Sequence, residues 1–315
     1  MNNKQITNTV LMIEPVAFGY NQQTATNNFF QQNDSVSLES IQEKALEEFR
    51  NMVEKLRKFG INVLFVKDTE QPHKPDSIFP NNWISFHSDG KVVLYPMYAK
   101  NRRAERREDI LDIIEQEGFI INEIIDYSKA EEEEEIFLEG TGSMVLDRTH
   151  EIAYAAISER THEELFIEFC EDLEFSPVVF HSTQEKEGKR YPVYHTNVMM
   201  SVTEDFAILC KESIQDAKER KLVIDFLQTT KKEVISISEE QMNHFLGNTL
   251  QLENDKKERF LVMSHTAYQS LNAGQINTIN KYSQILVFDI PTIEKYGGGS
   301  VRCMLAEIFL PRTES

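Results

Sequence analysis

Apolar residues follow two alternating patterns along this chain, one with the period of a helix and one typical of a buried strand. The first helical pattern consists of apolar side chains three or four positions apart: Ile41, Ala45, Phe49, Met52, Val53 and Leu56. This spacing places the apolar side chains on one face of a helix. The pattern stops at Gly60, and the apolar run INVLFV begins at Ile61. We therefore predict a helix that ends near Gly60 and leads into a buried strand.

The order of helix, break and strand recurs four more times. The helical segments LDIIEQEG and LFIEFCEDL precede the strand-like runs FIINEII and PVVF, and weaker helical patterns precede VISI and ILVFDI. The five strand-like runs begin roughly 50 to 60 residues apart, at Ile61, Phe119, Pro177, Val234 and Ile285. Such even spacing indicates repeated modules arranged around one axis.

Hairpins are predicted between these helices and strands. The segment NWISFHSDGKVVLYP alternates apolar and polar positions around Asp89-Gly90, a strong signal for a two-residue turn. The segment GSMVLDRTHEIAYAAI does the same around Arg148 to Glu151. Each module is therefore predicted to contain strand, strand, helix and strand. Because no linker rich in Pro, Gly or Ser divides the modules, we expect a single α/β domain that spans residues 1–315.

Composition and charge narrow the classes of function. With 315 residues, of which 40% are hydrophobic, the chain can bury a large core. The formal net charge of -19 makes nucleic acid and anionic membranes poor partners, because both require a surplus of Lys and Arg. Three scattered cysteines cannot build a disulfide framework, and no run approaches the ~20 apolar residues that span a bilayer. We expect a cytoplasmic protein with a small-molecule partner.

Two charged segments have ordinary explanations. The run Glu131 to Glu135 separates two modules and is expected to be a solvated loop. Four arginines open a predicted helix, where cations oppose the helix dipole: Arg102, Arg103, Arg106 and Arg107. These arginines could hold a substrate carboxylate, but acidic neighbours such as Glu105 favour a surface charge network.

Cys303 is the candidate nucleophile. It follows the run GGGSVR, and glycines allow the close backbone approach that a thiol needs if its sulfur is to face a substrate. The alternative is a small buried residue that opens the strand CMLAEIFL. Cys170 and Cys210 lie among apolar helix and strand residues, so we expect both in the core.

A thiol is a modest nucleophile at neutral pH until a base activates it. His195 is the candidate base because it opens the run HTNVMMSV at the mouth of a predicted strand, although a lone histidine there can be structural. Glu139 in LEGTG could orient the histidine or hold a nitrogen-rich substrate, or it could lie in a surface turn. No pair of histidines has the spacing of a metal site, so no metal is expected.

Position in the modules links these residues. Asn82, Glu139 and His195 each begin a predicted hairpin of successive modules, and Cys303 begins the closing strand. In a ring of similar modules, equivalent strand ends meet at the axis. The four residues are therefore expected to converge although they lie far apart in the sequence.

Four blocks of sequence resemble the signature blocks of the arginine deiminase and amidinotransferase superfamily: FPNNW, LEGTGSMVLD, HTNVMMS and GGGSVRCM. The resemblance covers almost the whole chain, and it is closest to the branch of citrulline-using hydrolases. It implies a five-bladed α/β propeller with its site on the axis, and it requires no cofactor. It also maps the superfamily's catalytic cysteine, histidine and acidic residue onto Cys303, His195 and Glu139.

The chain departs from the deiminase pattern at two positions. Arginine deiminases have aspartates at the positions that match Asn82 and Asn197, and these carboxylates clamp a cationic guanidinium. An asparagine both donates and accepts hydrogen bonds, so two amides fit the carbonyl oxygen and NH₂ group of a neutral ureido group. Expected substrate contacts are Asn82, Asn197, Phe79 and Asp76, where Asp76 supplies a further carboxylate or only caps a turn.

The resemblance implies hydrolysis of citrulline to ornithine, carbon dioxide and ammonia through an S-carbamoyl enzyme. Three alternatives stay open: an arginine deiminase or dihydrolase, an amidinotransferase with the same Cys and His, and a non-enzymatic binding protein of the same fold. The sequence also leaves the oligomeric state open, a homodimer included.

Overall fold

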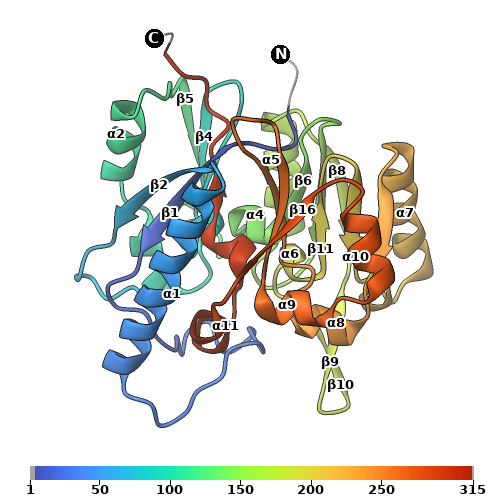
Figure 1. The fold of residues 1–315 in the computed structure, drawn as a ribbon, viewed down its shortest axis with the longest axis horizontal. Helices are drawn as coiled ribbons and strands as arrows, with labels where there is room; N and C mark the ends of the chain where they lie inside the picture. Colours follow the sequence, from blue (N-terminus) through green and yellow to red (C-terminus); the bar gives the residue numbers. More distant parts are fainter. Residues whose placement is uncertain (1–3, 314–315) are drawn as a thin grey trace.

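In the computed structural model, which describes residues 4–313, most strands belong to five three-stranded sheets. Four of the sheets consist of strands that follow one another in the chain (Figure 1). Their strands are β3 (Ile84–Phe86), β4 (Lys91–Leu94) and β5 (Glu123–Asp126); β6 (Met144–Asp147), β7 (Ile152–Ala156) and β8 (Ser176–Phe180); β11 (Met200–Val202), β12 (Phe206–Leu209) and β13 (Glu233–Ser236); and β14 (Leu250–Glu253), β15 (Arg259–Ser264) and β16 (Gln284–Phe288).

These four sheets share one topology. The first two strands form an antiparallel hairpin, and the third strand runs parallel to the second. The helices between the second and third strands are α2 (Asp109–Gln116), α5 (Glu163–Asp172), α7 (Ala217–Thr229), and α9 (His265–Ser270) with α10 (Ala273–Ile279). The predicted order of strand, strand, helix and strand is confirmed. The predicted run from Phe119 is shorter than expected, because β5 begins only at Glu123.

The fifth sheet joins the two ends of the chain. The strand β1 (Thr9–Glu14) pairs in parallel with β2 (Asn62–Lys67) and antiparallel with β17 (Ala306–Glu307), so that Val10 faces Glu307. The helix α1 (Leu38–Lys58) connects β1 to β2 and buries the apolar face that the sequence predicted. Both ends of the described chain therefore lie at one end of the molecule (Figure 1).

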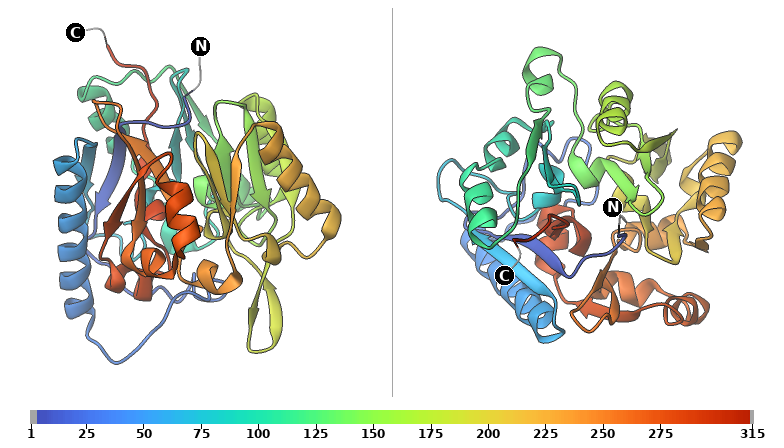
Figure 2. Two further views of the ribbon diagram at one scale, coloured as in Figure 1. Left: turned by 45° about the vertical axis from the view of Figure 1, so that its right-hand side comes forward. Right: turned by 90° about the horizontal axis from the view of Figure 1, so that it is seen from above.

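Helices cover the outer faces of the sheets (Figure 2, right). The helix α1 packs Phe49 and Met52 into an apolar cluster that includes Val10 and Val63 of its own sheet. Burying a side chain of this size contributes about 1.5 to 3 kcal/mol, so the helix is held mainly by this face. Cys170 and Cys210 are buried in other apolar clusters, as predicted. No helix within residues 4–313 is long and apolar enough to cross a membrane.

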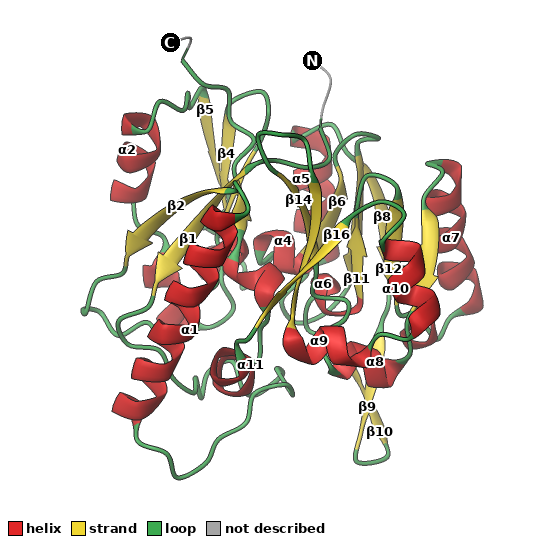
Figure 3. Ribbon diagram, viewed as in Figure 1, coloured by secondary structure: helices red, strands yellow, loops and turns green. Residues whose placement is uncertain are grey.

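Short helical turns precede the first strand of several sheets, in the middle of the molecule (Figure 3). They are η1 (Pro80–Asn82), α4 (Gly140–Ser143), α6 (Thr196–Met199) and η4 (Val301–Met304). The sequence predicted that hairpin strands begin at the first three positions and the closing strand at the fourth, but a tight turn comes first in each case. The remaining elements are η2 (Lys100–Glu105), α3 (Ala130–Glu133), β9 (Thr183–Lys186), β10 (Lys189–Pro192), η3 (Lys211–Ser213), α8 (Glu239–Asn243) and α11 (Pro291–Gly297).

The acidic run after β5 is exposed from Glu132 to Glu135, as predicted for a solvated segment, but it is not all loop. It forms the short helix α3, and Glu131 is buried within it. The Glu131 carboxylate pairs with Arg106 at 2.5 Å and Arg103 at 3.5 Å, and it accepts a hydrogen bond from the backbone of Met97. A buried carboxylate with these partners holds the segment after β4 in place.

Candidate active site

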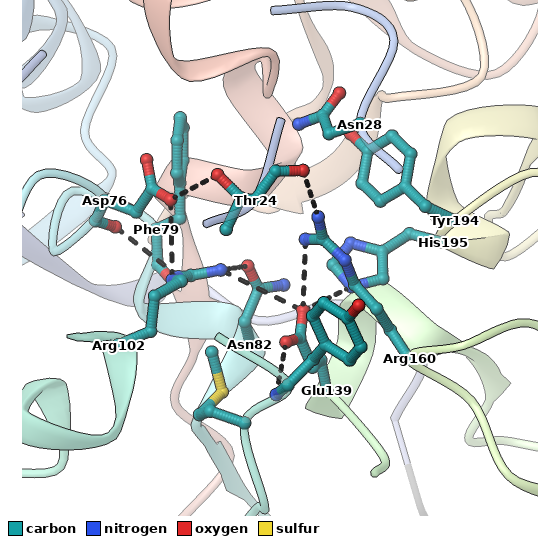
Figure 4. A network of polar contacts seen from close by, with 12 residues as sticks. Thr24, Asn28, Asp76, Phe79, Asn82, Arg102, Glu139, Arg160, Tyr194 and His195 are labelled. Atoms are coloured by element: carbon teal, nitrogen blue, oxygen red, sulfur yellow. Dashed lines mark hydrogen bonds and ion pairs between the residues drawn. The ribbon is translucent and has the colours of Figure 1, made fainter. Parts of the chain in front are cut away.

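The turns at the centre of the molecule place a histidine against a carboxylate. Glu139 immediately precedes α4 and His195 immediately precedes α6. The Nε2 atom of His195 lies 2.7 Å from the Oε2 atom of Glu139, and both side chains are buried (Figure 4). The carboxylate can only accept, so Nε2 carries a proton and Nδ1 is left as the basic nitrogen.

A small cavity lies beside this pair. Its lining residues come from the segment after β1 and from loops and short helical turns that connect the sheets: Thr24, Asn28, Asp76, Phe79, Asn82, Arg102, Arg160, Tyr194, His195, Gly297, Gly298, Gly299 and Cys303. The cavity has a volume of about 10 Å³, which is about the space of one water molecule. A larger hollow of about 490 Å³ beside β9 lacks a cysteine, so the chemistry points to the smaller cavity.

Five of the seven predicted site residues line this cavity. They are Cys303, His195, Asn82, Phe79 and Asp76, and Glu139 lies directly behind His195. Asn197 does not line it. It lines a separate small cavity, and its side chain donates from Nδ2 to the Thr141 carbonyl at 3.2 Å.

Burial and charge set the protonation of the histidine pair. Burial lowers the pKa of His195 to about 4, although the Glu139 carboxylate favours the protonated ring. Burial alone would raise the pKa of Glu139, but Arg160 and His195 bring it down to about 2. At neutral pH the site therefore contains a neutral imidazole and an ionised carboxylate, which is the state of a general base held in one orientation.

Arg102 is part of this site and not of a surface network, so the surface prediction was wrong for this residue. Its guanidinium is buried and pairs with both carboxylate oxygens of Glu105 at 2.9 Å. The Nη1 atom of Arg102 also donates to the Oδ1 atom of Asn82 at 2.9 Å (Figure 4). Within the described residues, the Nδ2 atom of Asn82 is buried without a hydrogen-bond partner.

Asp76 lies at the cavity and does not merely cap a turn. Its Oδ2 atom accepts hydrogen bonds from Asn21 at 2.7 Å and Thr24 at 3.2 Å, and Arg102 lies 3.8 Å away. Its Oδ1 atom has no hydrogen-bond partner among residues 4–313. Burial raises the pKa of this carboxyl, against the effect of Arg102.

Arg160 is a site residue that sequence reasoning missed. Its guanidinium lies 3.5 Å from the Glu139 carboxylate and over the ring of Tyr194, with 4.9 Å to the ring centroid. It also donates to the Thr24 carbonyl at 2.9 Å, which ties the segment after β1 to the cavity. No local motif surrounds Arg160 in the sequence, so only the three-dimensional fold identifies it.

Glycines bring the loop before Cys303 against Phe79. A Cβ atom on Gly297 would lie 2.7 Å from the Phe79 ring, and Gly298 has a φ of +64° that L-residues rarely adopt. The Sγ atom of Cys303 lies 3.6 Å from Nδ2 of Asn197 and 3.2 Å from Nδ2 of Asn248. Asn248 is a second residue that sequence reasoning missed.

The described residues contain no cluster of three or more His, Cys, Asp or Glu side chains that could hold a metal ion. The groups that the site offers are a thiol, a neutral imidazole, carboxylates, two guanidinium groups and amides. This set can perform nucleophilic attack with acid–base catalysis on a polar, planar group.

A comparison with protein families gives a match over residues 14–310, to the family described as N,N-dimethylarginine dimethylhydrolase, eukaryotic. A search of curated proteins gives no match to this sequence.

Several solved structures are similar in fold. The apo structure of ArgZ, an arginine dihydrolase from the ornithine-ammonia cycle in cyanobacteria, is 16% identical and has a TM-score of 0.74. The match covers 97% of this chain but only 41% of ArgZ, so this chain spans about two fifths of that protein. The N-terminal domain of ArgZ bound to product is 17% identical over 96% of this chain and 99% of the domain, with a TM-score of 0.71. A DDAH mutant from Pseudomonas aeruginosa, complexed with citrulline, is 15% identical over 96% of this chain and 100% of that one, with a TM-score of 0.62.

Proposed function

Because the chain belongs to the family described as N,N-dimethylarginine dimethylhydrolase, eukaryotic, we propose that it is a cysteine hydrolase whose site best fits the ureido group of citrulline. The family consists of hydrolytic enzymes that modify guanidino groups, and the resemblance to the arginine deiminase and amidinotransferase superfamily is thereby confirmed. The choice of citrulline within this chemistry is our proposal.

The observation that carries this choice is the unpaired donor of Asn82. Arg102 can only donate, so it holds Oδ1 of Asn82 and leaves Nδ2 of the same amide without a partner. A buried donor without a partner is costly, and a substrate acceptor would satisfy it. The carbonyl oxygen of a ureido group is such an acceptor, whereas every nitrogen of a guanidinium carries hydrogens and donates.

In the proposed first step, the Cys303 sulfur attacks the ureido carbon after its proton passes to Nδ1 of His195. The bond from the carbon to the side-chain nitrogen breaks, and His195 returns the proton to that nitrogen. Ornithine leaves, and Cys303 holds a carbamoyl group as an S-thiocarbamate. Glu139 supports both transfers because its ionised carboxylate stabilises the imidazolium that forms in between.

In the second step, water attacks the carbamoyl carbon while His195 accepts one of its protons. The carbon–sulfur bond breaks, and carbamic acid leaves and decomposes to carbon dioxide and ammonia. His195 passes its proton to the departing Cys303 sulfur, which restores the thiol, so no other reactant is needed.

The rest of the cavity suits the carboxylate and ammonium groups of an amino acid. Arg102 and Arg160 provide two guanidinium groups for a carboxylate, and the unpaired Oδ1 atom of Asp76 can accept from an ammonium group. Because the cavity holds only about one water molecule, we expect Arg160 and the segment around Thr24 to move when substrate binds.

A second candidate is an arginine dihydrolase, which would hydrolyse a guanidino group twice. It is favoured by the carboxylates of Glu139 and Asp76 at the site, since N–H groups of a guanidinium can donate to them. The similar fold of ArgZ, described as an arginine dihydrolase, agrees with this candidate. Both candidates need the same second step.

We also propose that the chain forms one domain, a five-bladed α/β propeller. The support is the set of five three-stranded sheets with similar topology, and the turns that lead into three of them supply Asn82, His195 and Cys303 to the cavity. The pairing of β1 with β17 would close the ring.

The test is incubation of the protein with citrulline, arginine, N,N-dimethylarginine and agmatine, followed by amino-acid, amine and ammonia analysis. We expect ornithine and ammonia in equal amounts from citrulline, and little reaction with agmatine, which lacks a carboxylate for the two arginines. The Cys303→Ser variant is the control for a contaminating activity. If citrulline is inert while arginine or N,N-dimethylarginine reacts, the choice of substrate is wrong.

A further inference from the structure

Four of the five sheets place one site residue in the turn before their first strand or, in the closing sheet, before β17. These residues are Asn82, Glu139, His195 and Cys303. The remaining sheet begins with β14 at Leu250, and the buried residue two positions earlier is Asn248. Asn248 therefore occupies in its module the place that Asn82 occupies before β3.

The orientation of the Asn248 amide follows from its neighbours. The backbone N–H of Arg302 can only donate, and it contacts Oδ1 of Asn248 at 3.1 Å. The carbonyl of Asn197 can only accept, and it lies 3.3 Å from Nδ2 of Asn248. Both contacts require Nδ2 to face the Sγ atom of Cys303, which lies 3.2 Å from it.

The backbone holds this amide close to the sulfur. Gly247 packs against the end of α6, because a Cβ atom there would lie 2.1 Å from the carbonyl oxygen of Val198. Phe245 adopts a φ of +61°, and the Asn248 N–H donates to the Phe245 carbonyl at 2.9 Å. A tight turn that only a glycine permits thus brings Asn248 beside Asn197 and Cys303.

The sulfur needs such a donor, because a protonated histidine is not available to it. His195 is neutral at neutral pH, so no imidazolium partner is present before the reaction starts. Burial disfavours the charged form of a thiol, and it raises the pKa of the buried Cys170 to about 12. A thiolate is a strong acceptor for an amide N–H, whereas a thiol is a weak one.

We propose that Asn248 is a catalytic residue that stabilises the Cys303 thiolate by donating a hydrogen bond from Nδ2 to Sγ. This role rests on the proposed function, in which Cys303 is the nucleophile. The same donor also stabilises the sulfur when it leaves as a thiolate in the second step. Asn197 is a weaker partner, because its Nδ2 atom is farther from the sulfur and already donates to Thr141.

The test measures alkylation of Cys303 by iodoacetamide as a function of pH, with the modified residue identified by mass spectrometry. Loss of one charge-assisted hydrogen bond in Asn248→Ala should slow alkylation at neutral pH about tenfold and move the pH midpoint upward. Asn248→Asp keeps the acceptor for Arg302 but removes the donor and adds a negative charge, so it should slow alkylation further.

A matched control is Asn254→Ala, which removes another buried amide from the same module. Asn254 donates to the Phe59 carbonyl and to Glu258 and does not contact the sulfur, so this variant should alkylate like the wild type. Thermal unfolding verifies that each variant is folded, and if Asn248→Ala does not fold, Asn248→Asp provides the measurement. In turnover of the preferred substrate, kcat should fall about tenfold for Asn248→Ala while KM stays nearly constant.

Alkylation requires no substrate, so the outcome does not depend on which substrate the enzyme uses. Wild-type rates of alkylation in both Asn248 variants would overturn the role of Asn248 even if citrulline is hydrolysed. Slowed alkylation in both variants supports the role even if citrulline is inert and the proposed substrate is wrong.

Discussion

The two ends of the strand β3 lead into two buried polar clusters, each with a histidine, and the clusters differ in the partners of that histidine. Asn82 precedes the strand and belongs to the cavity with His195, whereas His87 follows the strand and contacts Arg148 and Ser85. Both histidines are buried, and burial lowers the pKa of both rings. Neither burial nor a shifted pKa therefore separates a candidate catalytic histidine from a structural one.

The hydrogen-bond partners of the two histidines distinguish them. His87 contacts the hydroxyl of Ser85 at 2.9 Å, and that hydroxyl contacts the hydroxyl of Tyr95 at 2.6 Å. His195 is held by Glu139 beside a cavity that a cysteine lines. Among the described residues, the cavity also contains two unpaired buried atoms, Oδ1 of Asp76 and Nδ2 of Asn82, whereas none of the unpaired buried atoms belongs to Ser85, His87 or Tyr95. Unpaired polar atoms mark where a ligand would complete the structure.

The largest expected effect on turnover distinguishes Cys303 from Cys210. Cys303→Ser should abolish turnover, because a serine hydroxyl is a far weaker nucleophile than a thiolate in this setting. Cys210→Ser is the matched variant, since Cys210 is equally buried and burial raises the pKa of its thiol to about 11. It should lower the free energy of unfolding and leave kcat close to the wild-type value. The measurement is steady-state turnover with thermal unfolding for both variants. Substantial activity in Cys303→Ser would exclude covalent catalysis by this residue.

The second-largest expected effect on turnover distinguishes His195 from His87. His195→Ala should lower kcat about 10²- to 10⁴-fold, because both proton transfers lose their general acid or base. His87→Ala removes a ring of equal burial from the other end of β3 and should reduce stability but keep kcat within a few fold. Steady-state kinetics on both variants, below their unfolding temperatures, make the comparison. Equal losses of kcat would mean that the two clusters do not differ in function.

The sequence predicted the modules well because the physics behind them is local. The helix that ends before Gly60 and the hairpin around Asp89-Gly90 follow from apolar periodicity and turn chemistry, and both are present. The convergence of Asn82, His195 and Cys303 on one cavity required only the idea that similar modules surround an axis. The same idea extends to the module that begins at β14 and would have identified Asn248.

Other features depended on contacts between distant segments. Arg102 lies among acidic residues in the sequence, and only the fold shows that its partners are Glu105 and Asn82 inside the molecule. Arg160 has no motif around it, and its partners Thr24 and Glu139 come from other parts of the chain. Periodicity carries no information on such pairs, because burial of a charged side chain depends on the partner that it meets.

The lowered pKa that the two buried histidines share should make the folded protein less stable at acidic pH. Each folded ring has a lowered pKa, so the unfolded chain binds protons that the folded chain does not bind. Stability should therefore be complete above the unfolded pKa of 6.5 and decline as the pH falls toward 4. For His195 alone the loss amounts to about 3 kcal/mol. Chemical denaturation between about pH 7.5 and about pH 4.5 should show a flatter decline in both His195→Asn and His87→Asn than in the wild type. An unchanged slope in either variant would contradict a lowered pKa for that ring.

The smallest expected effect concerns substrate choice and the unpaired donor in the cavity cluster. Asn82→Asp keeps an oxygen for Arg102 but replaces the Nδ2 donor with an acceptor. A ureido oxygen would lose its partner, at a cost of about 1 to 3 kcal/mol, while a guanidinium would gain a carboxylate. The ratio of kcat/KM for citrulline to that for arginine should fall about five-fold to more than a hundred-fold.

Both substrates must be measured on the wild type, on Asn82→Asp and on Asn81→Asp, because a general loss of activity says nothing about selection. Asn81 is the neighbouring buried amide, which donates to Thr141 and does not line the cavity, so its variant should keep the wild-type ratio. A shift in Asn82→Asp alone would tie substrate choice to the single donor that Arg102 leaves free. If the ratio of kcat/KM for citrulline to that for arginine is equal in all three proteins, Asn82 does not bind the ureido oxygen. The carboxylates of Glu139 and Asp76 would then favour the dihydrolase candidate.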